Sequence, residues 1–141
     1  MKKTINLFLA GVLLLTVLSA GAQQGEETAV RECLQNYMSG QGDRVEKAFH
    51  PSATMKYVDY QSKEFKDVPI AEYIARVKSN NASGTRSNRK IEIVSLNVEG
   101  SAAQAKIKIE TDKVIMYDYM NLLKINGEWK IVSKIFSRQD K

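Results

Sequence analysis

The fold class that this sequence predicts is α+β, and two observations predict it. Residues 30–49 carry apolar side chains at helical spacing, whereas residues 91–136 form successive segments in which apolar and polar side chains alternate. Helices followed by a run of strands are typical of an antiparallel sheet with its helices gathered on one face. We expect a strongly curved sheet, closed into a cone by a helical hairpin and one further helix.

The start of the chain has the order of segments that defines a secretory signal peptide. A basic head at Lys2 and Lys3 precedes an apolar run at residues 7–18, and the small residues Ala20-Gly21-Ala22 follow. The apolar run is too short to span a bilayer. We therefore expect residues 1–22 to be removed on export, most simply to the periplasm of a Gram-negative bacterium.

The remaining chain is long enough for one domain but not for two. We divide the 141 residues into a signal peptide at 1–22, a flexible leader at 23–28, a domain at 29–138 and a tail at 139–141. Without the two lysines of the signal peptide, the chain has 19 Lys and Arg and 16 Asp and Glu. An excess of three positive charges does not favour nucleic-acid binding. No later segment of the mature chain has membrane-spanning length, and a single cysteine, Cys33, excludes an internal disulfide.

Two short helices form the predicted hairpin. The apolar residues between 30 and 38 recur at i, i+3, i+4, i+7 and i+8, and Gly40 and Gly42 end this helix. A second helix from Asp43 ends before Pro51, since a proline disfavours helical geometry in the residue before it.

The strands and the third helix follow in order. Residues 53–59 alternate as a first strand, a second extended piece surrounds Phe65, and Pro69 precedes the third helix. The last four strands are predicted at residues 91–98, 103–109, 114–125 and 129–136, the final pair joined by the strong hairpin signal Asn126-Gly127.

The order of these elements resembles the nuclear transport factor 2-like (ketosteroid isomerase-like) superfamily, and local patterns over residues 28–137 resemble its lumazine-binding-like branch of secreted bacterial proteins. These patterns are Phe49-His50-Pro51 with Ala53, Asp67-Val68-Pro69-Ile70 with Tyr73, Asp118-Tyr119 with Leu122, and Trp129-Lys130-Ile131-Val132 with Lys134. The resemblance implies a cone-shaped fold with a pocket. The branch name implies lumazine or flavin binding, whereas the residues themselves specify no cofactor.

Asp118 is the sharpest candidate for chemistry. It stands in a row of apolar residues that share one face of its strand. An ionised carboxylate buried there needs a partner, or it must take up a proton. The resemblance implies that such a cavity carboxylate can act as a general base, but a carboxylate held by backbone amides, a tyrosine or a basic side chain is the commoner arrangement.

His50, the only histidine, is the second catalytic candidate, as an acid or base paired with Asp59 or Asp118. A structural role at the end of a helix is the alternative for this residue. One histidine and one cysteine do not provide the usual ligand set of a zinc site, so we expect no metal. The residues that we expect to line a ligand pocket are Tyr57, Tyr73, Met116, Asp118, Met120 and Trp129.

The sequence favours a secreted domain that binds a small apolar or planar molecule, and it leaves catalysis open. The alternatives are an isomerase, cyclase or dehydratase that uses Asp118, and an envelope protein-interaction module that works through its sheet. We also expect a homodimer, because the strand at residues 114–125 is apolar on both faces and helices cover only one side of the sheet.

Overall fold

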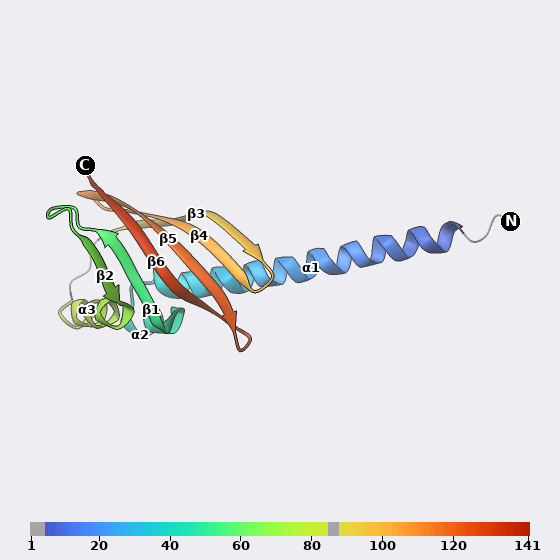
Figure 1. The fold of residues 1–141 in the computed structure, drawn as a ribbon, viewed down its shortest axis with the longest axis horizontal. Helices are drawn as coiled ribbons and strands as arrows, with labels where there is room; N and C mark the ends of the chain where they lie inside the picture. Colours follow the sequence, from blue (N-terminus) through green and yellow to red (C-terminus); the bar gives the residue numbers. More distant parts are fainter. Residues whose placement is uncertain (1–4, 85–87) are drawn as a thin grey trace.

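The computed structural model describes the backbone of residues 5–84 and 88–141 and the side chains of residues 21–84 and 88–141. Figure 1 shows the helices on one side of a strongly curved sheet, which confirms the α+β cone. The elements in chain order are α1 (Ile5–Met38), α2 (Gly42–Ala48), β1 (Phe49–Val58), β2 (Phe65–Pro69), α3 (Ile70–Ala82), β3 (Lys90–Glu99), β4 (Ala102–Glu110), β5 (Val114–Ile125) and β6 (Glu128–Asp140).

The strands form one sheet in the order β2-β1-β6-β5-β4-β3. All neighbours are antiparallel except β1 and β6, which run parallel. This parallel pair is the departure from the antiparallel sheet that the sequence predicts. The physical reason is connectivity: β1 enters the sheet from α2 and is separated from β6 by α3 and four strands, and such a long connection permits either direction.

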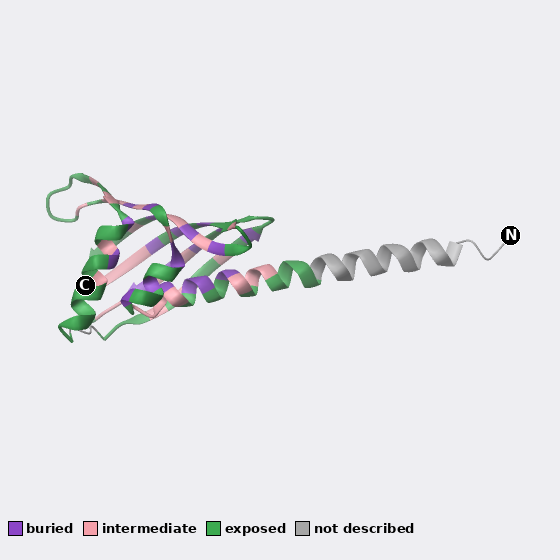
Figure 2. Cartoon of the chain, turned by 90° about the horizontal axis from the view of Figure 1, so that it is seen from below, coloured by how far each residue is buried: buried purple, intermediate pink, exposed green. Residues whose placement is uncertain are grey.

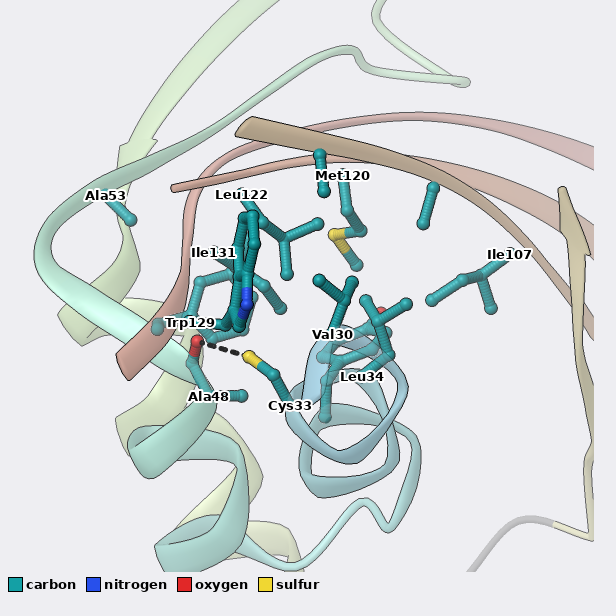
Figure 3. Packing of buried hydrophobic residues seen from close by; sticks show 14 of the residues in the cluster. Val30, Cys33, Leu34, Ala48, Ala53, Ile107, Met120, Leu122, Trp129 and Ile131 are labelled. Atoms are coloured by element: carbon teal, nitrogen blue, oxygen red, sulfur yellow. Dashed lines mark hydrogen bonds between the residues drawn. The ribbon is translucent and has the colours of Figure 1, made fainter. Parts of the chain in front are cut away.

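The core lies where α1 and α2 cover the sheet. Val30 and Leu34 of α1 are fully buried, and they meet Met120 and Leu122 of β5 and Ile131 of β6. Figure 3 shows these side chains pointing toward one another, with the Cys33 thiol donating to the carbonyl of Ala48 on α2. Figure 2 shows the buried residues gathered along α1, α2 and the strands that face them. The predicted apolar stripe of the first helix is therefore the base of the core.

A polar clamp holds the turn between α1 and α2. The side chain of Asn81, on α3, accepts a hydrogen bond from the backbone N–H of Gly42 and donates one to the carbonyl of Gly40, at 2.8 and 3.1 Å. Gly40 adopts a φ of +63°, a conformation that costs glycine little. The clamp fixes the hairpin to α3.

Both ends of the predicted domain extend further than expected. Residues 23–28 are part of α1 rather than a flexible leader, because Glu26 pairs with Lys124 and accepts a hydrogen bond from the indole of Trp129 at 2.9 Å. The predicted tail likewise belongs largely to β6, since Asp140 pairs with Val114 of β5 and the Lys141 ammonium lies 2.7 Å from Glu110. In each case ion pairs and hydrogen bonds order a segment that has little apolar character of its own.

The predicted signal peptide at residues 1–22 lies almost entirely outside the described side chains, which begin at residue 21. Among the residues that the structure describes, no helix is long and apolar enough to cross a membrane.

Candidate functional site

A cavity of about 510 Å³ opens on the concave side of the sheet, beyond the end of α1. It is bounded by the last turn of α1, α3, β1, β5, β6 and the turn between β1 and β2. Its lining residues are Tyr37, Met55, Tyr57, Val58, Asp59, Tyr60, Gln61, Tyr73, Arg76, Val77, Asn80, Arg89, Ile109, Met116, Lys134, Phe136, Arg138 and Asp140.

The local structure explains why aromatic rings form the walls. Along β1, the side chains of Met55 and Tyr57 point to the cavity because alternate residues of a strand share a face. The Tyr57 ring stacks on Phe136 of β6, with centroids 4.5 Å apart and planes 29° apart. On α3, Tyr73 begins a row at i, i+3, i+4 and i+7 that faces the same space. The walls therefore offer flat apolar surfaces with hydroxyl groups at their edges.

A buried polar cluster of Tyr37, Asp118 and Lys134 lies at the floor of the cavity. The Tyr37 hydroxyl donates a short hydrogen bond to Asp118 Oδ2, and Lys134 Nζ lies 2.7 Å from that hydroxyl and 3.1 Å from Asp118 Oδ2. Only 1% of Asp118 and 5% of Lys134 is exposed. The ammonium also lies 5.0 to 5.2 Å from three ring centroids, those of Tyr37, Tyr73 and Phe136. These contacts compensate the desolvation of the Lys134 charge.

A β-bulge directs Lys134 into the cavity. Leu122 of β5 pairs with Ile131 and Asn121 pairs with Ser133, so β6 carries one extra residue, Val132. Without the bulge, the side chains of Ser133 and the following odd-numbered residues would point to the inner face, as Ile131 does. Because of the bulge, the side chains of Lys134, Phe136 and Arg138 point inward instead, and all three line the cavity.

Burial and the neighbouring carboxylate both act on Tyr37. Removal from water raises the pKa of its hydroxyl well above the usual value of 10, and the negative charge of Asp118 raises it further. Tyr37 is therefore a hydrogen-bond donor at any physiological pH. Asp118 Oδ1 is buried without a hydrogen-bond partner among the described residues. Because Tyr37 and Lys134 line the cavity and Asp118 does not, the carboxylate lies behind them.

The structure brings half of the predicted pocket residues together. Tyr57, Tyr73 and Met116 line the cavity, and Asp118 supports its floor from behind. Met120 and Trp129 do not reach it, which corrects their prediction as pocket residues. They lie in the core under α1, where Met120 is fully buried and the Trp129 indole donates to Glu26.

His50 is separate from this cavity. Its Nδ1 lies 2.7 Å from the Ser52 hydroxyl, and its ring lines a second hollow of about 280 Å³ beside Ile70, Ile74 and Lys78. The predicted pairing of His50 with Asp59 or Asp118 is not formed. Within the described residues, no group of three His, Cys, Asp or Glu side chains is arranged to hold a metal ion.

Sequence reasoning missed Tyr37, Lys134, Arg76 and Arg89. The sequence pattern could have placed Arg76 in the pocket, because it follows Tyr73 by three positions and so lies on the same face of the helix. Tyr37 looked like one more member of an apolar stripe, although its position at the end of that stripe next to Gly40 was visible.

Fold and site together define a ligand-binding domain of the nuclear transport factor 2-like superfamily. The chain belongs to the protein family described as "Putative lumazine-binding", whose model matches residues 25–137.

Solved structures agree with this assignment. An NTF2-like protein of unknown function from Shewanella baltica is 26% identical, with a TM-score of 0.72 over 83% of this chain and 96% of that one. Another from Methylobacillus flagellatus is 27% identical, with a TM-score of 0.69 over 82% and 93%. A curated relative, the aldolase FrzH from Cladobotryum sp., is 23% identical over 97 residues, which are 69% of this chain and 75% of that protein.

Proposed function

We propose that this domain binds a small planar molecule in the cavity between α3 and the sheet. The observation that carries the proposal is that stacked aromatic rings and a buried cation line the same cavity. Tyr57, Tyr73 and Phe136 supply flat surfaces, and Lys134 supplies a charged donor at the floor. A cavity of about 510 Å³ lies within the range of small-molecule sites in proteins.

Lys134 defines what the ring should carry. An ammonium group has three N–H donors, and Lys134 uses one of them on the Tyr37 hydroxyl while its charge is paired with Asp118. A further N–H donor is left for a ligand acceptor, such as a ring carbonyl oxygen. Lumazines and flavins combine planar rings with carbonyl oxygens, so the family description agrees with the chemistry of the cavity.

Fluorescence titration with 6,7-dimethyl-8-ribityllumazine and with riboflavin tests the proposal. We expect saturable binding of at least one ligand and a loss of about tenfold in affinity in the Tyr57→Ala variant, since stacking on an aromatic ring is worth about 1–3 kcal/mol. Phe65→Ala, at an exposed position of β2 that does not line the cavity, is the matched control and should bind normally. Absence of binding, or equal losses in both variants, would contradict the proposal.

The enzymatic alternative with Asp118 as general base gains no support from the geometry. A substrate in the cavity would meet Lys134 and Tyr37 before it reached the carboxylate. The similarity to an aldolase, at 23% identity, does not identify a reaction for this cavity.

We propose further that the protein is exported. The pattern of residues 1–22 supports a cleaved signal peptide, and N-terminal sequencing of the exported protein should begin at Gln23. An intact Met1 on a cytoplasmic protein would contradict export.

A homodimer through the outer face of the sheet is the last part of the proposal. Three large apolar side chains are exposed there, Tyr119 at 37%, Leu123 at 41% and Ile135 at 51%. Tyr119 and Ile135 are direct neighbours across β5 and β6. This patch is also where a protein-interaction module would act. Sedimentation equilibrium at micromolar concentration should give a dimer mass that falls to the monomer in Ile135→Lys, and a monomeric wild type would contradict the dimer.

A further inference from the structure

The cavity has an excess of positive charge at its mouth. Arg76 of α3 and Arg89, directly before β3, both line it. Among the residues that the structure describes, neither guanidinium makes an ion pair. The Arg76 guanidinium lies over the ring of Tyr73, with its Cζ atom 5.8 Å from the ring centroid. Arg138, which lines the same cavity, differs in being paired with Asp140 at 3.2 Å.

The carboxylates of the cavity are already engaged. Asp59 accepts backbone hydrogen bonds from Gln61 and Ser62 at 3.0 and 2.8 Å, and these bonds lower its pKa. Asp140 holds Arg138, and Asp118 holds Lys134. Neither of the two carboxylates that line the cavity, Asp59 and Asp140, forms an ion pair with Arg76 or Arg89.

The position of Arg89 depends on a glycine. A Cβ atom built on Gly40 would lie 1.8 Å from the Arg89 Nη2 atom, so the guanidinium occupies space that any other side chain would take. Gly40 is itself fixed through its carbonyl, which accepts from Asn81. The α1–α2 turn thus provides a seat for Arg89 at the edge of the cavity.

We infer that the natural ligand carries an anionic group, a carboxylate, sulfonate or phosphate, which Arg76 and Arg89 bind while the planar part lies against the aromatic walls. The inference rests on the proposed function of the cavity and adds the charge of its ligand. Guanidinium groups suit oxyanions because their planar forks donate two parallel hydrogen bonds.

Two fluorescent probes of nearly the same aromatic shape test separately whether the cavity binds a planar molecule and whether its arginines bind an anionic group. 1-Anilinonaphthalene-8-sulfonate carries a sulfonate, and N-phenyl-1-naphthylamine lacks it. In Arg76→Gln/Arg89→Gln we expect the affinity of the sulfonate probe to fall about tenfold, whereas that of the neutral probe should change less than twofold. Arg31→Gln/Arg44→Gln removes the same charge from exposed sites outside the cavity, and both probes should bind it as they bind the wild type.

The outcomes distinguish the failures. If both probes bind but the cavity variant weakens neither, or weakens both equally, the anionic inference is wrong and the aromatic cavity stands. If the control variant weakens the sulfonate probe as much as the cavity variant does, net charge explains the effect and the inference is again wrong. If neither probe binds the wild type, the proposed planar-ligand site fails, and the inference fails with it.

Discussion

The two halves of the concave face are built by the same strands and yet have opposite characters. In the sealed half, Leu122 of β5 and Ile131 of β6 lie under α1 and exclude water. In the open half, Met116 of β5 and Phe136 of β6 line a cavity. Between them, the ion pair of Asp118 and Lys134 marks the boundary.

The difference comes from the helix rather than from the strands. The apolar stripe of α1 buries Val30 and Leu34 over the sealed half, and Tyr37 is its last buried member before Gly40 ends the helix. Beyond that point α1 covers no more of the concave face, and the cavity opens between α3 and the sheet. The place where a helix stops can therefore decide where a pocket begins, because strand faces alone do not distinguish core from cavity.

The largest expected effect lies at the boundary. Lys134→Met leaves the buried carboxylate of Asp118 without a charged partner, and we expect a loss of about 3–5 kcal/mol in the free energy of unfolding, measured by urea denaturation. The double variant Lys134→Met/Asp118→Asn, which removes both charges, should recover part of this loss. A double variant less stable than the single variant would contradict the assignment of Asp118 as the residue that needs Lys134.

The second prediction compares the two halves directly. Leu122→Ala opens a void in a closed core and should lower the free energy of unfolding by about 2–5 kcal/mol. Met116→Ala, on the same face of the same strand, removes a side chain that is only partly buried beside an existing cavity, and should cost about 1 kcal/mol. Equal losses in the two variants would remove the distinction between a sealed and an open half.

The smallest effect is a pH dependence of stability at Tyr37. Its pKa in the folded protein lies well above 10, whereas in the unfolded chain it is near 10. Above pH 10 the unfolded state therefore loses a proton that the folded state keeps, and stability falls as pH rises, by at most about 1.4 kcal/mol per pH unit. Tyr37→Phe should show a shallower decline between pH 10 and 11.5 than the wild type, measured by urea denaturation at each pH, and an equally steep decline would contradict the assignment.

Local patterns were sufficient to predict most of the fold. Helical spacing from Val30 located the buried face of α1, and the Asn126-Gly127 turn located the β5–β6 hairpin, because both signals depend on residues close in sequence. The parallel pairing of β1 with β6 was missed, since it joins segments about eighty residues apart.

The site was only partly predictable for a similar reason. Asp118 was recognised because a carboxylate in an apolar row is visible in one strand. Its partners were not, because Tyr37 comes from another element and Lys134 reaches the inner face only through the bulge at Val132, which has no signature in composition. Met120 and Trp129 were misplaced because their strand faces were right but the extent of α1 over them was unknown.

The seat of Arg89 has an evolutionary consequence. The atom that a new side chain at Gly40 would displace is the far end of a flexible arginine, so the collision itself can be relieved without moving the backbone. Asparagine tolerates positive φ better than most residues, which makes Gly40→Asn an accessible single change. Such a change would move a guanidinium at the mouth of the cavity while leaving the core untouched. Residue 40 does not line this cavity, yet a substitution there changes the position of a residue that does. Ligand preference can therefore evolve at this position without a change in the stability of the core.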